Sequence, residues 1–171
     1  MWNDTNIPLA VFFTLRCYGT WLHGDERGSV DRHNNKYGSP RIPANSNWRT
    51  HNEKLLLHPP VTLNAASRKS VEQAIRDLCK KRGWTLLAIN VRTNHVHAVI
   101  CIGSKRPKDA LIALKANSTR QLREDGQWPH EHSPWAEKGS KRNLWNEKSI
   151  LEACNYVDNA QGDELPDFDW W

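Results

Sequence analysis

Two histidines stand two residues apart in the run Asn94-His95-Val96-His97-Ala98, within an otherwise apolar stretch that favours a β-strand. Successive side chains of a strand alternate between its two faces, so His95 and His97 should project from the same face. Two neighbouring imidazoles on a rigid element can form half of a metal site. Such a site needs a third ligand and something to act on, and the rest of the chain must supply both.

A candidate nucleophile lies far along the sequence, at Tyr156. It comes one residue before Val157, which belongs to the apolar stripe of a predicted helix, so Tyr156 should lie about 100° to the side of that stripe. A tyrosine can act as a covalent nucleophile, but its reference pKa of about 10 means that it needs a metal, a base or a positive field near neutrality. A divalent cation on His95 and His97 could polarise a phosphate for it. These are the parts needed for strand cleavage through a phosphotyrosine.

Hydrophobic periodicity predicts the elements that must position these residues. Strands are expected at 9–17, 84–91 and 95–102, with a short fourth strand at 142–145, and helices at 67–81, 108–124 and 147–159. Gly83 should end the first helix, and Asn146 should cap the last. Residues 18–64 should form an irregular insertion after the first strand. This order predicts an α+β, ferredoxin-like (split βαβ) fold with an antiparallel sheet, two packed helices and a C-terminal helix that carries the tyrosine.

Length and composition indicate a single globular domain over residues 1–171. No apolar run approaches the roughly 20 residues that span a bilayer, and the N-terminus lacks the basic region of a signal peptide, so no membrane association and a cytoplasmic location are expected. The cysteines are expected to be small buried hydrophobes in a reducing compartment; they are Cys17, Cys79, Cys101 and Cys154.

Charge is unevenly distributed along the chain. The formal net charge is +5, yet the stretch from Asp158 to Trp171 holds five acidic residues and no basic one, so residues 1–157 carry +10. A body this basic favours a polyanionic partner, and nucleic acid is the commonest. The acidic tail, residues 163–171, could act as a solubilising end or could occupy the basic DNA groove when DNA is absent.

Four segments together resemble a known family, the single-tyrosine transposases of the HUH class (histidine, hydrophobic residue, histidine), which include the REP-associated tyrosine transposases. The segments read TNHVHAVI, LKANSTRQL, GSKRNLW and ILEACNYVDNAQGD, and the opening CYGTWLHGDERGSVD is similar to one subgroup. The likeness covers most of the chain. It implies that Tyr156 attacks a phosphodiester of single-stranded or hairpin DNA, which forms a 5′-phosphotyrosine link, releases a 3′-hydroxyl and can run in reverse to join strands.

The resemblance also implies that His95 and His97, with a Gln or Asn of the tyrosine helix, hold Mg²⁺ or Mn²⁺. The family's amide usually lies four residues after the tyrosine, where this chain has Ala160, with Asn159 and Gln161 on either side. An ideal helix places Asn159 about 60° and Gln161 about 140° from Tyr156, which favours Asn159. However, Gly162 implies that the helix is ending, and a loosened last turn could swing Gln161 inward. The family-like pattern YVxxxQGD favours Gln161.

Basic residues on helix faces and loops are candidate DNA contacts: Lys115, Arg120, Arg123, Lys141, Arg142 and Arg27. A second His-x-His pair, His130 and His132, sits in a polar loop and is expected to be solvated or to face DNA rather than to bind metal. Relatives act as monomers or as homodimers, and the sequence leaves both open. Two alternative functions also stay open. One is a domesticated, non-catalytic module that binds hairpin DNA or RNA, and the other is a metal-dependent hydrolase that uses water.

Overall fold

A computed structural model describes residues 6–20 and 43–162 of the chain, and the predicted α+β fold is confirmed. Four strands form one sheet in the order β2-β3-β1-β4, and all neighbouring strands run antiparallel. The strands are β1 (Ala10–Cys17), β2 (Thr85–Val91), β3 (His95–Cys101) and β4 (Trp135–Leu144). The helices are α1 (Ser46–Lys54), α2 (Ala65–Arg82), α3 (Pro107–Glu124) and α4 (Glu147–Asn159).

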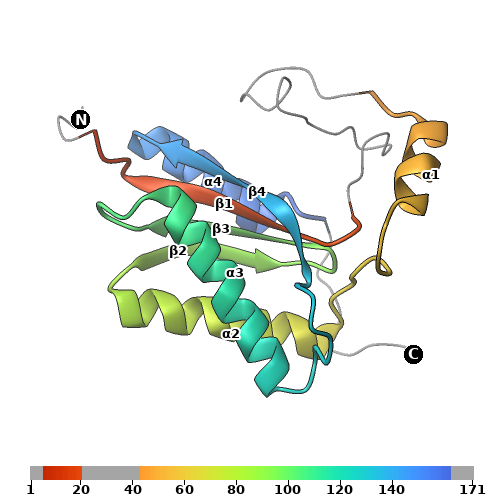
Figure 1. The fold of residues 1–171 in the computed structure, drawn as a ribbon. Coiled ribbons are helices and arrows are strands. Elements are labelled where there is room, and N and C mark those ends of the chain that lie inside the picture. The colour runs from red at the N-terminus through yellow and green to blue at the C-terminus, as the bar shows by residue number, and fades with distance from the viewer. Residues whose placement is uncertain (1–5, 21–42, 163–171) are drawn as a thin grey trace.

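Helices cover both faces of the sheet. Figure 1 shows α2 and α3 lying across one face, with α4 behind the other. The larger core joins α2 and α3 to one side of the central strands, through residues such as Phe13, Val96 and Ile100. A smaller core joins Ala153 and Val157 of α4 to Val99 and its neighbours on the other side. Because His95 and His97 share the parity of Val99, they face α4 rather than the main core.

Local signals explain where the predicted helices begin and end. Asn64 and Asn146 accept hydrogen bonds from the backbone N–H groups of Ser67 and Ser149, as N-caps of α2 and α4. Gly83 ends α2 in the left-handed conformation, with φ of 69°, which an L side chain rarely adopts. These boundaries lie within two residues of those predicted from the sequence.

The expectation that residues 18–64 are wholly irregular is wrong, because α1 lies within that range. None of the residues of α1 is buried, so its sequence lacks the hydrophobic periodicity by which an amphipathic helix is recognised. Local hydrogen bonds hold it instead: Asn45 caps it, and Arg49 pairs with Glu53 one turn later. Residues 21–42, which include the predicted DNA contact Arg27, and the acidic tail at 163–171 lie outside the described residues.

The prediction of a short fourth strand at 142–145 is also wrong in length, since β4 begins at Trp135. Within the described part of the chain this strand pairs with β1 alone, and its mostly exposed polar residues obscure the alternating pattern. Trp135 at the start of β4 is buried at 3% exposure, and its Nε1 donates to the backbone oxygen of Lys115. The Nζ of Lys115 in turn donates to the backbone oxygens of Ala136, Glu137 and Lys138.

The four cysteines are all free thiols. Cys17 and Cys79 are buried as predicted, whereas Cys101 and Cys154 are partly buried beside the smaller core. Burial raises the pKa of Cys17 to about 12, so this thiol stays protonated and unreactive near neutrality. In the described part of the chain, no helix is long and apolar enough to cross a membrane.

Candidate active site

The two histidines of β3 lie side by side on the face covered by α4, with ring centroids 4.6 Å apart. His97 is 5% exposed, whereas His95 is only partly buried. Each imidazole is oriented through its Nδ1. That of His97 lies 2.9 Å from Thr14 Oγ1, and that of His95 lies 2.7 Å from Asn94 Oδ1. When Nδ1–H donates to these oxygens, Nε2 carries the lone pair that can bind a ligand.

Thr14 was not found by sequence reasoning, although a signal was present. It is the one hydroxyl residue in a first strand that is otherwise apolar except for Arg16, and a buried polar group needs a partner. The strand register supplies that partner, because Thr14 lies directly opposite His97 on β3. Asn94 was quoted only as part of the motif, and the structure gives its side chain a specific hydrogen-bonding role.

Burial lowers the pKa of His97 to about 3. The neighbouring His95 contributes in the same direction, and a hydrogen bond to the backbone of Phe13 opposes both. A neutral imidazole is the form that binds a metal ion, so His97 is held in its ligand form across the whole neutral and mildly acidic range.

Gln161 and Asn159, the two candidate third ligands, lie in different places. Helix α4 ends at Asn159, and Gln161 follows its C-cap, with Oε1 3.0 Å from Nε2 of His95. The side chain of Asn159 points elsewhere and donates to Oδ1 of Asn155 on the exposed surface of α4. The structure therefore brings Gln161, and not Asn159, to the histidines.

The pair formed by His95 Nε2 and Gln161 Oε1 fits a shared cation. With Nδ1–H directed at Asn94, two lone pairs face each other across 3.0 Å, and this contact is favourable only if a proton or a metal ion stands beside both atoms. Two ligands at right angles and each about 2.1 Å from an ion lie about 3.0 Å apart. Imidazole nitrogen and amide oxygen are suitable donors for Mn²⁺ and, less strongly, for Mg²⁺.

No cluster of three or more His, Cys, Asp or Glu side chains that could hold a metal occurs among residues 6–20 and 43–162. A metal site at this place would therefore depend on the amide of Gln161 and on oxygens from water or from a substrate phosphate, in addition to the two imidazoles. Such an open donor set is typical of a catalytic rather than a structural ion.

Tyr156 lies on α4 directly across from these side chains. Its ring centroid is 5.6 Å from that of His97, and 43% of the residue is exposed. The helix is held in place by the buried Val157, whose backbone oxygen accepts a hydrogen bond from the Asn90 side chain on β2. Tyr156 is therefore both accessible and fixed beside the histidines.

Phe12 of β1, another residue that the sequence did not reveal as part of the site, connects the remaining parts. Its ring lies 5.1 Å from His97 and 6.0 Å from Tyr156, measured between centroids. The guanidinium carbon of Arg142 lies 5.4 Å from the centroid of the same ring. Arg142 pairs with Phe12 across β1 and β4, so this predicted DNA contact shares the face of the histidines.

The other predicted DNA contacts that the structure describes lie away from this face. Lys115 is partly buried against β4, and burial, followed by the positive charge of Arg16, lowers its pKa, while Glu137 opposes the shift. Arg123 donates to the backbone oxygens of His130 and Glu131. Arg120 is exposed and bonds Asn117, and Lys141 is exposed on β4. The roles of these residues in DNA binding stay predictions.

Both the sequence and the fold of this chain are similar to those of known proteins. The family model described as "Transposase IS200 like" matches residues 60–159, which is more than half of the chain and includes both histidines and Tyr156. The crystal structure of a candidate transposase from Deinococcus radiodurans R1 is 14% identical, with 94% of this chain and 97% of that chain covered, at a TM-score of 0.46. At that score the backbones overlap too loosely to inform the site. No curated protein matches the sequence significantly.

Proposed function

Because the chain belongs to the family of IS200-like transposases, we propose that it cleaves and rejoins single-stranded or hairpin DNA, with Tyr156 as the nucleophile. The observation that carries this proposal is the convergence of three distant segments. Tyr156 of α4 lies 5.6 Å from His97 of β3 between ring centroids, and Gln161 lies 3.0 Å from His95. A phenol, two oriented imidazoles and an amide are the groups that this chemistry requires.

In the proposed reaction, Oη of Tyr156 attacks the phosphorus of a phosphodiester. The bond between phosphorus and O3′ breaks, so the phosphate stays on O5′ of the downstream strand and joins the 5′ end of that strand to Tyr156 as a phosphotyrosine ester. The phenolic proton passes to solvent, which reaches the half-exposed tyrosine, and the departing O3′ takes up a proton to become a hydroxyl. In the reverse direction, a 3′-hydroxyl attacks the phosphotyrosine and restores the diester and the free phenol.

His95, His97 and Gln161 would hold Mg²⁺ or Mn²⁺. When bound, the ion would polarise the scissile phosphate and offset the charge that develops on its oxygens. The protein's own contribution is to orient both imidazoles, through Thr14 and Asn94, and to keep His97 neutral by burial. Arg142, held over the ring of Phe12, supplies a fixed positive charge on the same face for a DNA phosphate.

The proposal is tested with a labelled hairpin oligonucleotide that carries single-stranded flanks, incubated with the protein and Mn²⁺. We expect the wild-type protein to form a covalent protein–DNA adduct that survives denaturation, and Tyr156→Phe to form none, because only the phenol is lost. Tyr37→Phe serves as the matched control and should retain the adduct.

Other outcomes would select the alternatives. An undiminished adduct with Tyr156→Phe would contradict the proposed nucleophile. Cleavage without a covalent stage, insensitive to Tyr156→Phe, would indicate a hydrolase that uses water. Tight binding without Mn²⁺ and without cleavage would indicate a non-catalytic hairpin-binding module.

A further inference from the structure

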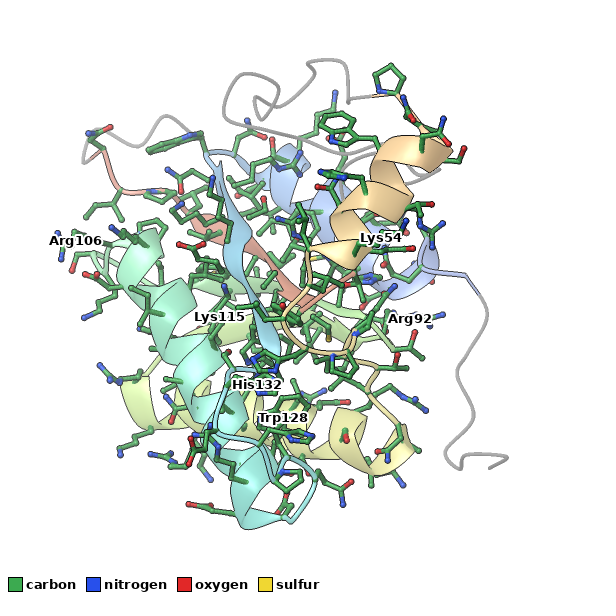
Figure 2. All side chains as sticks on the ribbon, turned by 45° about the vertical axis from the view of Figure 1, so that its right-hand side comes forward. Lys54, Arg92, Arg106, Lys115, Trp128 and His132 are labelled. Atoms are coloured by element: carbon green, nitrogen blue, oxygen red, sulfur yellow. The ribbon has the colours of Figure 1, made fainter. Side chains whose placement is uncertain are left out.

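Three imidazoles that the proposed reaction does not use form a column, which we call the histidine stack. The rings of His58 and His132 lie parallel, at 2° and 3.7 Å between centroids, and His130 continues the column 5.2 Å beyond His132 at 26°. Tyr18 contacts the edges of His58 and His132, and Trp128 contacts those of His130 and His132. Figure 2 shows His132 and Trp128 next to each other below Lys115.

Hydrogen bonds fix the two segments that carry the stack. The Nε1 group of Trp128 donates to the backbone oxygen of His132, and Arg123 donates to those of His130 and Glu131. On the other segment, the hydroxyl of Tyr18 accepts from the backbone N–H of Leu57. The rings are therefore preorganised, which reduces the entropy lost when a ligand binds.

The stack is poorly arranged for a metal ion. Nitrogen lone pairs lie in the plane of an imidazole, so two rings stacked face to face cannot direct them at a common point between the rings. In agreement with this geometry, no metal-binding group of three such side chains occurs among the described residues. The column leaves the outer faces of His58 and His130 for an aromatic ligand, and His132 between them supports both rings.

An open groove of about 510 Å³ adjoins the stack at His58. Its other lining residues are mostly apolar, and Leu57 is 87% exposed; they are Glu53, Leu56, Leu57, Pro59 and Pro60. A flat ring at the edge of an apolar groove favours a planar, largely apolar ligand over a charged one. A nucleobase has this chemistry, and a phosphate does not.

Electrostatics at the stack fit a nucleic acid. Partial burial, followed by electrostatic interactions with His58, His130 and Arg123, lowers the pKa of His132. A neutral ring can stack on a base, and the guanidinium of Arg123 can attract an adjoining phosphate. Two acidic residues also belong to this region: Glu53 lines the groove, and Glu131 lies between His130 and His132 in the sequence.

The stack lies at the same end of the sheet as the catalytic histidines. Tyr18 directly follows β1, and the preceding Cys17 donates its backbone N–H to the oxygen of Asn94, the residue that orients His95. Tyr18 and Trp128 pack against the larger core, on the face of the sheet opposite the histidines, so a DNA strand that contacts both sites would pass round this end of the sheet.

We propose that the histidine stack and the adjoining groove hold an unpaired nucleobase of the DNA substrate, at a site separate from the cleavage centre. This inference rests on the proposed function, because it takes its ligand from the same DNA. It assigns a binding role to His58, His130 and His132, and it implies that the protein distinguishes bases from bare sugar-phosphate backbone at this place.

The test compares two single-stranded oligonucleotides of equal length, one made of thymidines and one with abasic sites throughout. The affinity of the protein for each is measured by fluorescence anisotropy. Both carry the same phosphates, so the ratio of their affinities measures contacts to bases. We expect His58→Ala combined with His132→Ala to reduce that ratio by about 5- to 150-fold, the range for one stacked base, and to leave abasic binding unchanged. His132→Phe, which keeps a flat ring, should retain most of the ratio.

Trp48→Ala is the matched control, since Trp48 is a half-exposed aromatic residue of α1 outside the stack, and it should leave the ratio unchanged. An unchanged ratio in the double variant, or an equal loss of affinity for both oligonucleotides, would overturn the inference. Adduct formation is measured separately: an adduct with an unchanged ratio contradicts this inference alone, and a reduced ratio without any adduct contradicts the proposed reaction alone.

Discussion

His97 is the more deeply placed of the two histidines, and its environment determines its protonation. A pKa near 3, lowered from 6.5 by burial, means that between these values the unfolded chain binds a proton here that the folded chain does not. The free energy of unfolding should therefore fall as the pH falls through this window, by up to about 1.4 kcal/mol per pH unit from this group.

Urea unfolding of the metal-free protein at pH 7, 6 and 5 measures this effect. The wild-type protein should lose more stability than His97→Gln over the same range, because the variant has no group to protonate at this position. Other titrating groups are common to both proteins and cancel in the comparison. Equal losses in both proteins would contradict the lowered pKa.

We predict that Gln161 is the third metal ligand. Gln161 Oε1 adjoins His95, whereas Asn159 bonds Asn155. Gln161→Ala should weaken Mn²⁺ binding, measured by electron paramagnetic resonance without DNA, on the order of tenfold or more, and Asn159→Ala should leave it unchanged. The reverse pattern would assign the amide to Asn159.

Helix geometry explains why the sequence could not decide between these two amides. Within an ideal helix Asn159 is closer to Tyr156, so the choice depends on where α4 ends. The structure ends α4 at Asn159, and Gln161 is free of helical geometry. The sequence signal for that ending is Gly162, which has φ of 83°, but one glycine predicts a boundary only to within a few residues.

At the scale of elements, strand pairing matters most to the site, because the β1–β3 register sets Thr14 opposite His97. The parity of His95 and His97 could be predicted from their spacing alone. The register could not, since it depends on pairing between segments that are more than 80 residues apart. The length of β4 was missed for a related reason: its partner, β1, lies more than 100 residues earlier in the chain.

Gly139 of β4 tests this arrangement. A Cβ at this position would lie 2.8 Å from the backbone oxygen of Thr14 and 3.3 Å from Leu111, so the strand would have to move. Gly139→Ala should reduce the free energy of unfolding by about 1–3 kcal/mol in urea titrations. Ser140→Ala, at the exposed neighbouring position, is the control, and an equal effect of both substitutions would exclude the steric explanation.

At the scale of the whole molecule, charge should govern the affinity for DNA. With a net charge of +5 and an acidic C-terminal stretch, the basic body should release counterions from bound phosphates. Three phosphate contacts would weaken single-strand binding about tenfold or more between 50 and 200 mM KCl, at a logarithmic slope of about −0.7 per contact.

One variant tests whether part of this salt dependence arises from Arg142, which lies beside the histidines. Arg142→Gln should reduce its magnitude by about 0.7, because Arg142 lies over Phe12 beside the histidines. Arg76→Gln, on the outer surface of α2 and paired with Glu72, should leave it unchanged. An unchanged slope with Arg142→Gln would remove this residue from the DNA contacts.

The central claim is that the tyrosine of α4 forms the covalent bond to DNA, and mass spectrometry of the adduct tests it directly. The sequence has three tyrosines, and trypsin cleaves after Lys148, so it releases Tyr156 in a peptide that begins at Ser149 and contains neither Tyr18 nor Tyr37. After nuclease digestion of the adduct, we predict a nucleotide mass on that peptide, localised to Tyr156. A nucleotide on Tyr18, on Tyr37 or on any residue other than Tyr156 would contradict the account.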